Sequence, residues 1–273
     1  MSTALQSLVF MDTETANVRG APFLLEIGAV RVVDGEAQET FQELVLPPVP
    51  IDPEATEIHG IQEDQVRQAD FAPAVLRRFC EFVGDDWMVA HNAAFDARVL
   101  AYECARGSVT PPSGAFLDTL SLAKRHLPDS PDHKLQTLCQ FLNFESGRHH
   151  RALDDAVWCW RVFEACAEEA KNNPDDWTQA KLLGRVPITV ASHTPSPPRV
   201  PGRLRGLERA VAEEEEINLL YTGATGAGST LPVLPRFLFE RKKKGYLEAE
   251  CLRSGLLKTY LLDKVKRVSS VGS

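Results

Sequence analysis

The six cysteines of this 273-residue sequence lack the CxxC spacing that is typical of dithiol and metal sites. Most fall within apolar helical patterns, where a thiol behaves as a small hydrophobic group. The sequence also lacks any apolar run of about 18 residues. The opening stretch, MSTALQSLVF, has no basic region before a long apolar segment. These absences argue against a membrane helix and a secretion signal, and we expect a reduced, cytoplasmic protein.

No internal repeat is found, but charge is distributed unevenly along the chain. The net charge is -8; residues 1–180 carry 14 basic and 29 acidic side chains, whereas residues 181–273 carry 16 and 9. The stretch 184–206 contains five prolines and no acid, which is typical of an extended linker. We therefore predict a first domain over 1–180, a linker over 184–206 and a small basic β domain over 207–273.

Two acids follow the first apolar strand pattern. Leu8 to Met11 reads as a buried strand, and the next residues are DTET. Because alternate side chains of a strand share a face, Asp12 and Glu14 project together. Like charges so close are costly unless something positive lies between them. The alternative is that Glu14 turns into solvent after the strand, and the residues alone leave both open.

Further along, the first unit alternates between strand and helix patterns. LLEIGAVRVV and ETFQELVL are strand-like and meet at Asp34-Gly35, which predicts a hairpin. Helical periodicity runs from Pro73 to Val83, and the short apolar run WMVA reads as another buried strand.

Two more acids lead the apolar faces of predicted helices. Asp96 shares a face with Val99 and Leu100, and a buried acid must be paired or hold a metal. From Asp155, the positions three, four, seven, eight and eleven residues later are all apolar. Asp154 lies instead on a mixed flank where an acid is solvated or paired. The helical phase therefore favours Asp155.

These four acids each lie at the end or start of an element and point toward the core. Clustered carboxylates of this kind suit hard divalent cations such as Mg²⁺ or Mn²⁺, which take oxygen ligands. Two histidines, His149 and His150, precede the Asp155 helix. Periodicity does not separate them, and either one alone is more simply a helix-capping or pairing residue.

The motifs together resemble the DnaQ-like, or DEDDh, 3′ to 5′ exonucleases, which include the epsilon subunit of DNA polymerase III, ribonuclease T and oligoribonuclease. The resemblance covers about residues 5–170, and an ordered set of motifs is far more specific than any single one. The matching stretches are FMDTET with LLEIGAV, IHGI, VAHNAAFDARVL, DTLSLAKRHLP with HKLQTLCQFL, and HHRALDDA.

The resemblance implies a ribonuclease H-like α/β fold with a mixed, largely five-stranded sheet and a site for two divalent cations. It implies Asp12, Glu14, Asp96 and Asp155 as metal ligands and catalytic residues. The histidine of the last motif stands five positions before its aspartate, which selects His150 as the general base and leaves His149 as a neighbour. It also implies nucleotide contacts at five positions: Thr13, Thr15, Glu26, His91 and Asn92.

The implied activity is metal-dependent release of 5′-mononucleotides from the 3′ end of single-stranded DNA or RNA. Trimming of RNA 3′ ends is an alternative that the sequence leaves open. A non-catalytic nucleic-acid or nucleotide sensor is another, and the intact set of four acids and His150 argues against it. The sequence also leaves open a replication or repair protein partner and a homodimer.

The second unit reads as β structure after an acidic run, with strand patterns INLLY, LPVLPRFLF, YLEAECL and KTYLLDKV. Residues of about 214–268 resemble a WYL domain, with Gly245-Tyr246-Leu247 at the motif that names it. Glycine stands where that motif has tryptophan, and Leu231 and Leu261 stand where the family often carries arginine. For RKKKG, a solvated hairpin turn competes with a contact to single-stranded nucleic acid, to which Tyr221, Tyr246 and Tyr260 would add stacking surfaces.

Overall fold

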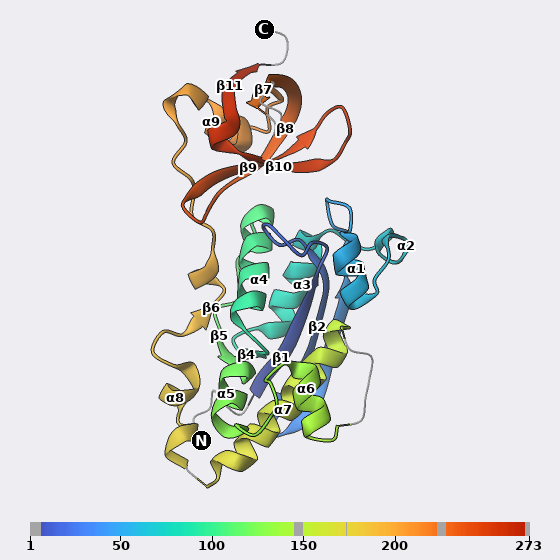
Figure 1. Cartoon of the computed structure of the whole chain (residues 1–273), viewed down its shortest axis with the longest axis vertical. Helices are drawn as coiled ribbons and strands as arrows, with labels where there is room; N and C mark the ends of the chain where they lie inside the picture. The colour runs from blue at the N-terminus through green and yellow to red at the C-terminus, as the bar shows by residue number, and fades with distance from the viewer. Residues whose placement is uncertain (1–6, 145–149, 173, 223–227, 271–273) are drawn as a thin grey trace. The chain divides into compact units, whose positions relative to one another are not determined.

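The computed structural model (Figure 1) describes residues 7–144, 150–172, 174–222 and 228–270. The chain divides into two compact units, Met1–Thr194 and Pro195–Ser273. The division lies inside the proline-rich stretch. Ile188–Thr189 forms a strand of the first unit, and Leu204 packs in the core of the second. The domain boundaries drawn from the sequence stay a prediction.

Over the described residues, the first unit has a mixed six-stranded sheet in the order β3-β2-β1-β4-β5-β6. The pairs β1–β2, β2–β3 and β5–β6 are antiparallel, and β1–β4 and β4–β5 are parallel. The predicted α/β, ribonuclease H-like fold is confirmed, and the two-residue β6 extends the five expected strands. The strands are β1 Ser7–Thr15, β2 Leu24–Val33, β3 Glu36–Leu44, β4 Trp87–Ala90, β5 Ala115–Asp118 and β6 Ile188–Thr189.

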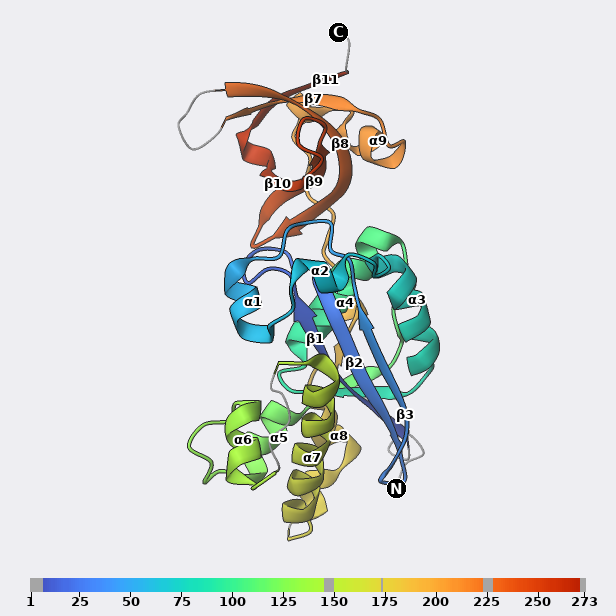
Figure 2. The ribbon, with the colours of Figure 1, turned by 90° about the vertical axis from the view of Figure 1, so that its right-hand side faces the viewer.

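Helices cover both faces of this sheet (Figure 2). The α-helices described in the first unit are α1 Pro53–His59, α2 Glu63–Val66, α3 Ala72–Val83, α4 Ala94–Gly107, α5 Thr119–His126, α6 Leu135–Phe141, α7 Ala152–Ala170 and α8 Gln179–Leu183. A short 3₁₀ helix, Pro174–Trp177, lies between α7 and α8.

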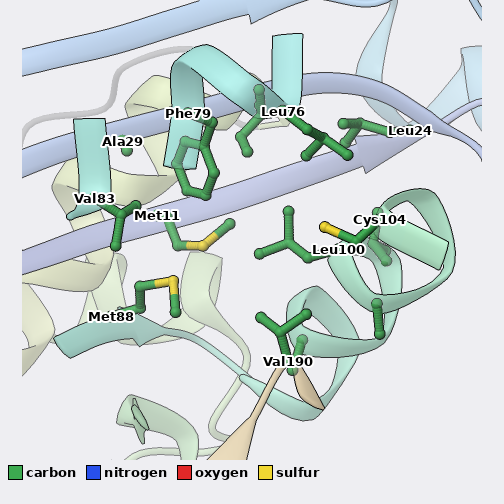
Figure 3. Close-up of a cluster of buried hydrophobic side chains, with 14 of the residues drawn as sticks. Met11, Leu24, Ala29, Leu76, Phe79, Val83, Met88, Leu100, Cys104 and Val190 are labelled. Carbon is green, nitrogen blue, oxygen red and sulfur yellow. The ribbon is translucent and has the colours of Figure 1, made fainter. Parts of the chain in front are cut away.

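Strand alternation on β1 separates two hydrophobic cores. Val9 and Met11 pack with residues of α3 and α4, such as Phe79 and Leu100, as Figure 3 shows for Met11, Phe79 and Leu100. Leu8 and Phe10 point the other way and pack with residues of α5, α6 and α7. This period-2 pattern predicts that Asp12 and Glu14 continue the face that α7 covers.

The second unit has an antiparallel five-stranded sheet, over its described residues, in the order β10-β9-β8-β7-β11. Helix α9 Leu207–Ala212 contributes to its core. The strands are β7 Ile217–Thr222, β8 Gly228–Arg241, β9 Lys244–Cys251, β10 Leu257–Leu261 and β11 Val265–Ser270. Two 3₁₀ helices also belong to this unit, Gly202–Leu204 and Leu262–Lys264.

Several local features differ from the sequence reading. KTYLLDKV was read as one strand, but a 3₁₀ turn at Leu262–Lys264 divides it into β10 and the start of β11. RKKKG is the β8–β9 hairpin: Lys242 and Lys243 occupy the turn with positive φ and are exposed. Tyr260 is buried and packs edge-on against Tyr221, so core packing accounts for this pair.

Among the described helices, none is both long enough and apolar enough to cross a membrane.

Candidate active site

The N-terminus of α7 packs directly on the sheet beside Asp12. On β2, Gly28 is the register partner of Asp12. A Cβ built on Gly28 would lie 2.1 Å from the backbone nitrogen of Leu153 and 2.3 Å from the carbonyl carbon of Ala152. Only a glycine admits this close approach. The missing side chain at Gly28 therefore brings the first turn of α7, with Asp155, to the carboxylates of β1.

His150 and Asp155 are tied to each other at the start of α7. The backbone N–H of His150 donates to Oδ2 of Asp155 at 3.2 Å, and His150 itself has a φ of 63°. A positive φ at a residue other than glycine costs about 1–3 kcal/mol and persists only where the surroundings enforce it. Ligand atoms of Glu14, His150 and Asp155 all lie within 4.8 Å of one another. The strained backbone thus brings this histidine to the two carboxylates.

Asp96 reaches the same group of acids from the other side of β1. It lies in the first turn of α4, only 1% exposed. Its Oδ1 accepts a 2.7 Å hydrogen bond from the hydroxyl of Thr13, which points to the α4 face. The charge of Asp96 is the largest electrostatic influence on Asp12, after the loss of hydration. The β1 strand therefore carries two candidate ligands on one face and, on the other, the hydroxyl that hydrogen-bonds Asp96.

The pKa values of all four carboxylates are raised, chiefly by burial. Loss of hydration and the nearby acids raise the pKa of Asp12 well above its usual value. Burial, with Asp155 and Glu26 nearby, raises the pKa of Glu14 to about 8. Burial also raises the pKa of Asp96 and that of Asp155 to about 7 each. At neutral pH this group accepts positive charge readily, as protons or as a cation.

The donor set fits hard divalent cations. It offers carboxylate oxygens from β1, α4 and α7 and one imidazole, a combination suited to Mg²⁺ or Mn²⁺. Arg151 offsets this negative charge only in part: it lowers the pKa of Glu14 but is itself paired with Glu26 at 2.6 Å. Like-charged buried groups without a compensating cation are otherwise unfavourable. The residues present therefore suit the metals that the sequence resemblance implies.

Glu26, expected from the resemblance to contact the terminal nucleotide, is instead occupied by protein contacts. It is 0% exposed, and its Oε1 accepts from Nη2 of Arg151 at 2.6 Å and Nε2 of Gln42 at 3.0 Å. Its Oε2 accepts from Nε of Arg151 at 3.0 Å and from the backbone N–H of Ala152 at 3.1 Å. This Glu26 clasp fixes the two residues that follow His150. A direct contact between Glu26 and nucleotide stays a prediction.

The other expected nucleotide contacts are partly engaged by the protein. The Thr15 hydroxyl donates to the carbonyl oxygen of Asn17 at 3.1 Å. The His91 ring lies 3.0 Å from the Thr119 hydroxyl and 2.8 Å from the His133 carbonyl oxygen. Asn92 has a φ of 69°, and its N–H donates to Asp118. Contacts of Thr13, Thr15, His91 and Asn92 with a nucleotide stay predictions. His149 lies outside the described residues.

Two residues near the site were not singled out from the sequence. Arg151, beside His150, forms the Glu26 clasp, and His59 in IHGI lines a cavity of about 350 Å³ together with Arg151. Nδ1 of His59 accepts from the N–H of Ile61, and burial lowers the pKa of His59. The signal for Arg151 was available, because a buried glutamate on β2 requires a cationic partner.

Comparison with known proteins agrees with this geometry. The family model described as "Exonuclease" matches residues 9–163, and the model described as "WYL domain" matches residues 202–270. The two resemblances drawn from the sequence are thereby confirmed.

Relatives and solved structures agree on the fold. A PolC-type DNA polymerase III of Oceanobacillus iheyensis is 31% identical over 172 residues, 61% of this chain, but the chain spans only 12% of that relative. The DEDDh nuclease domain of a 3′ exonuclease bound to rAMP aligns over 60% of this chain and 92% of its own, with TM-score 0.53 and 19% identity. E. coli Exonuclease I in complex with a dT13 oligonucleotide aligns over 97% of this chain and 66% of its own, with TM-score 0.56 and 14% identity.

Proposed function

The chain belongs to the exonuclease family, and we propose that it removes nucleotides one at a time from the 3′ end of single-stranded DNA or RNA, releasing 5′-mononucleotides. One observation carries this proposal: ligand atoms of Glu14, His150 and Asp155 lie within 4.8 Å of one another, and burial together with the charges of Asp96, Glu14 and Asp155 raises the pKa of Asp12. The solved structures with similar folds support it, since one holds rAMP and another a DNA oligonucleotide.

Divalent cations, when bound, would draw negative charge from the scissile phosphate and favour ionisation of the attacking water. Asp12, Glu14, Asp96 and Asp155 would hold these cations. The 2.7 Å hydrogen bond from Thr13 would hold the Asp96 carboxylate in place. The carboxylates thus supply a fixed negative cage that needs no rearrangement during the reaction.

His150 would take the proton from the attacking water at a ring nitrogen. A ligand nitrogen of its imidazole lies within 4.8 Å of the Glu14 and Asp155 oxygens, so that water held among these groups is within its reach. Its backbone N–H is held by Asp155, and the next residues by Glu26. Both bonds restrict where the ring lies, which is what a general base requires.

The second unit would act as a nucleic-acid or partner-binding module. Its support is the excess of basic over acidic residues in 181–273 and the match to the WYL domain. A module tethered to the nuclease unit raises the effective concentration of the strand near the site.

A labelled-strand assay tests the proposal. Single-stranded DNA and RNA oligonucleotides with a 5′ label are incubated with the full chain and Mg²⁺ or Mn²⁺. We expect a ladder that shortens from the 3′ end, abolished by chelation, and a shift in rate that identifies the preferred sugar. Internal cleavage, or binding with no shortening of either strand, would contradict the proposal in favour of an endonuclease or a sensor.

A further inference from the structure

A second cavity, of about 540 Å³, opens beside the carboxylate site. His150 and Asp155 form part of its wall, so it is continuous with the group of metal-binding candidates. Lys124 of α5 and Lys134, at the start of α6, also line it. The cavity therefore joins the candidate catalytic residues to two cationic side chains that are distant from them in sequence.

The charges in this cavity are unlike those of the rest of the unit. Residues 1–180 have more than twice as many acidic as basic side chains. Yet Asp155 is the only acid among the described residues of the cavity wall, which also carries Lys124 and Lys134. No ion pair between either lysine and a carboxylate is found among the described residues, although the backbone N–H and the charge of Lys134 both lower the pKa of the exposed Asp132. Both are exposed and able to bind an anion.

The segment that carries Lys134 is held in place by hydrogen bonds. The backbone N–H of Lys134 donates to Oδ1 of Asp132 at 2.9 Å. The preceding carbonyl oxygen, of His133, lies 2.8 Å from Nε2 of His91, and the His133 ring lies 3.2 Å from the carbonyl oxygen of Leu127. These hydrogen bonds fix the position of the backbone from which the Lys134 side chain extends, as expected for a preformed binding site.

The cavity also has apolar surface. Leu120 and Leu135 belong to its wall beside the two lysines. Apolar side chains next to cations suit a nucleotide, whose sugar and base present apolar faces and whose phosphates carry charge. Because the scissile phosphate must lie at the carboxylates, the next nucleotide of the strand has to leave the site through a neighbouring space. This cavity is a neighbouring space of the right chemistry.

We propose that this cavity binds the nucleotide next to the 3′ end, with Lys124 and Lys134 holding the phosphate on that nucleotide's 5′ side. The inference rests on the proposed function and adds the route of the strand. It explains how an acidic unit takes up a polyanion: the cationic contact is confined to one phosphate beside the metals.

Neutralising one phosphate at a time tests this subsite. Single-stranded 10-mers carry a methylphosphonate at the second linkage from the 3′ end, which leaves the scissile linkage intact. The full chain is mixed in excess with Mn²⁺, and release of the 3′ nucleotide is timed. We expect the neutral linkage to slow the wild-type protein by about tenfold, as for loss of one charged hydrogen bond.

The double variant Lys124→Ala/Lys134→Ala should be slowed by a similar factor on the normal strand and should not be slowed further by the neutral linkage. This non-additivity would identify the two lysines and the phosphate of the second linkage as groups that interact with each other. Arg125→Ala removes a charge next to Lys124 but outside the cavity wall. The neutral linkage should slow this variant as much as it slows the wild type. The double variant Lys124→Arg/Lys134→Arg keeps both charges, and the neutral linkage should slow it to the same extent. A neutral linkage five positions from the end should leave the wild-type rate unchanged.

A wild-type rate that is indifferent to the second linkage would overturn the subsite, as would a full penalty in the alanine variant. Failure of the proposed function gives a different result, because no 3′ nucleotide would then be released from any strand.

Discussion

Glu14 and Glu26 stand opposite each other on β1 and β2, yet their surroundings move their pKa values in opposite directions. Burial beside other acids raises the pKa of Glu14 to about 8. For Glu26, burial acts upward too, but the hydrogen bonds from Arg151, Ala152 and Gln42 outweigh it and lower the pKa. Two glutamates in register thus differ in whether the protein supplies their positive partner.

This difference separates an acid that the chain itself satisfies from an acid that is a candidate metal ligand. Glu26 is satisfied by groups of the chain itself, and its carboxylate fixes the segment after His150. Burial and the charges of Asp155, Glu26 and Asp96 raise the pKa of Glu14, and Arg151, already paired with Glu26, opposes them only in part. A buried acid whose partner is missing from the chain is the better candidate for metal binding.

The largest expected effect comes from removing one charge of the unpaired group. Asp155→Asn should lower the rate of 3′-nucleotide release by at least about a thousandfold, since it removes a fixed electrostatic contact to the reacting groups. Asp154→Asn is the matched control on the adjacent position, and it should change the rate by less than about threefold. Single-turnover kinetics on one oligonucleotide measure both. Equal losses in the two variants would mean that the helical phase assignment is wrong.

His150 should have the next largest effect. His150→Gln removes the basic nitrogen but keeps a polar side chain, and we expect turnover to fall by about 10² to 10⁴. Mn²⁺ binding should persist because the carboxylates remain, and calorimetry checks this. An unchanged turnover would transfer the base role to another group.

Replacing Glu26, the acid that is paired with Arg151, should affect the stability of the fold. Glu26→Ala leaves Arg151 and the Ala152 N–H without their acceptor, so unfolding free energy should fall by about 2–4 kcal/mol. Glu43→Ala removes the more exposed pair with Arg78 and should cost about 0–1 kcal/mol. Denaturant unfolding with a chelator present measures both variants. If they lost equal stability, the clasp would be no more than an ordinary surface pair.

The smallest expected effect is a pH dependence of metal stabilisation. Because the pKa values of Glu14, Asp96 and Asp155 are raised to about 8, 7 and 7, the folded metal-free protein keeps protons that the unfolded chain has lost. Their contribution to stability is therefore complete below the ordinary pKa of about 4 and disappears as pH rises to about 8. Glu26, with its lowered pKa, contributes in the opposite sense, and its share is lost as pH falls.

Thermal melts with chelator or with Mn²⁺ between about pH 5 and pH 8 measure this dependence. The increase in melting temperature caused by Mn²⁺ should grow with pH in the wild type, because the acids lose competing protons. Asp155→Asn should show a smaller increase at every pH. If the increase in melting temperature caused by Mn²⁺ were constant over this pH range, the assignment of the raised pKa values would be contradicted.

Much of the first unit could be predicted from the sequence because its signals are local. The unbroken apolar run from Leu8 to Met11 predicts a strand buried on both faces, and helical phase singles out Asp155 over Asp154. The Glu26 clasp could not be predicted in this way, since it joins residues 125 positions apart in sequence. Nor could the proximity of α7 to β2, which depends on the backbone contact at Gly28.

The second unit was harder to predict because its boundaries depend on long-range pairing. A continuous strand pattern hid the 3₁₀ turn at Leu262–Lys264, where the chain passes from β10 to β11 at opposite edges of the sheet. Helix α9 was missed because only six residues form it, too few to show a helical period. Short helices owe their stability to packing rather than to their own periodicity.

Diffraction from crystals grown with Mn²⁺ and a 5′-mononucleotide would show whether the four carboxylates hold two cations, because anomalous scattering locates manganese without reference to activity. We expect two peaks about 4 Å apart, bounded by Asp12, Glu14, Asp96 and Asp155, with the nucleotide's phosphate in contact with them. Crystals with ordered nucleotide and no anomalous density among these carboxylates would contradict this expectation.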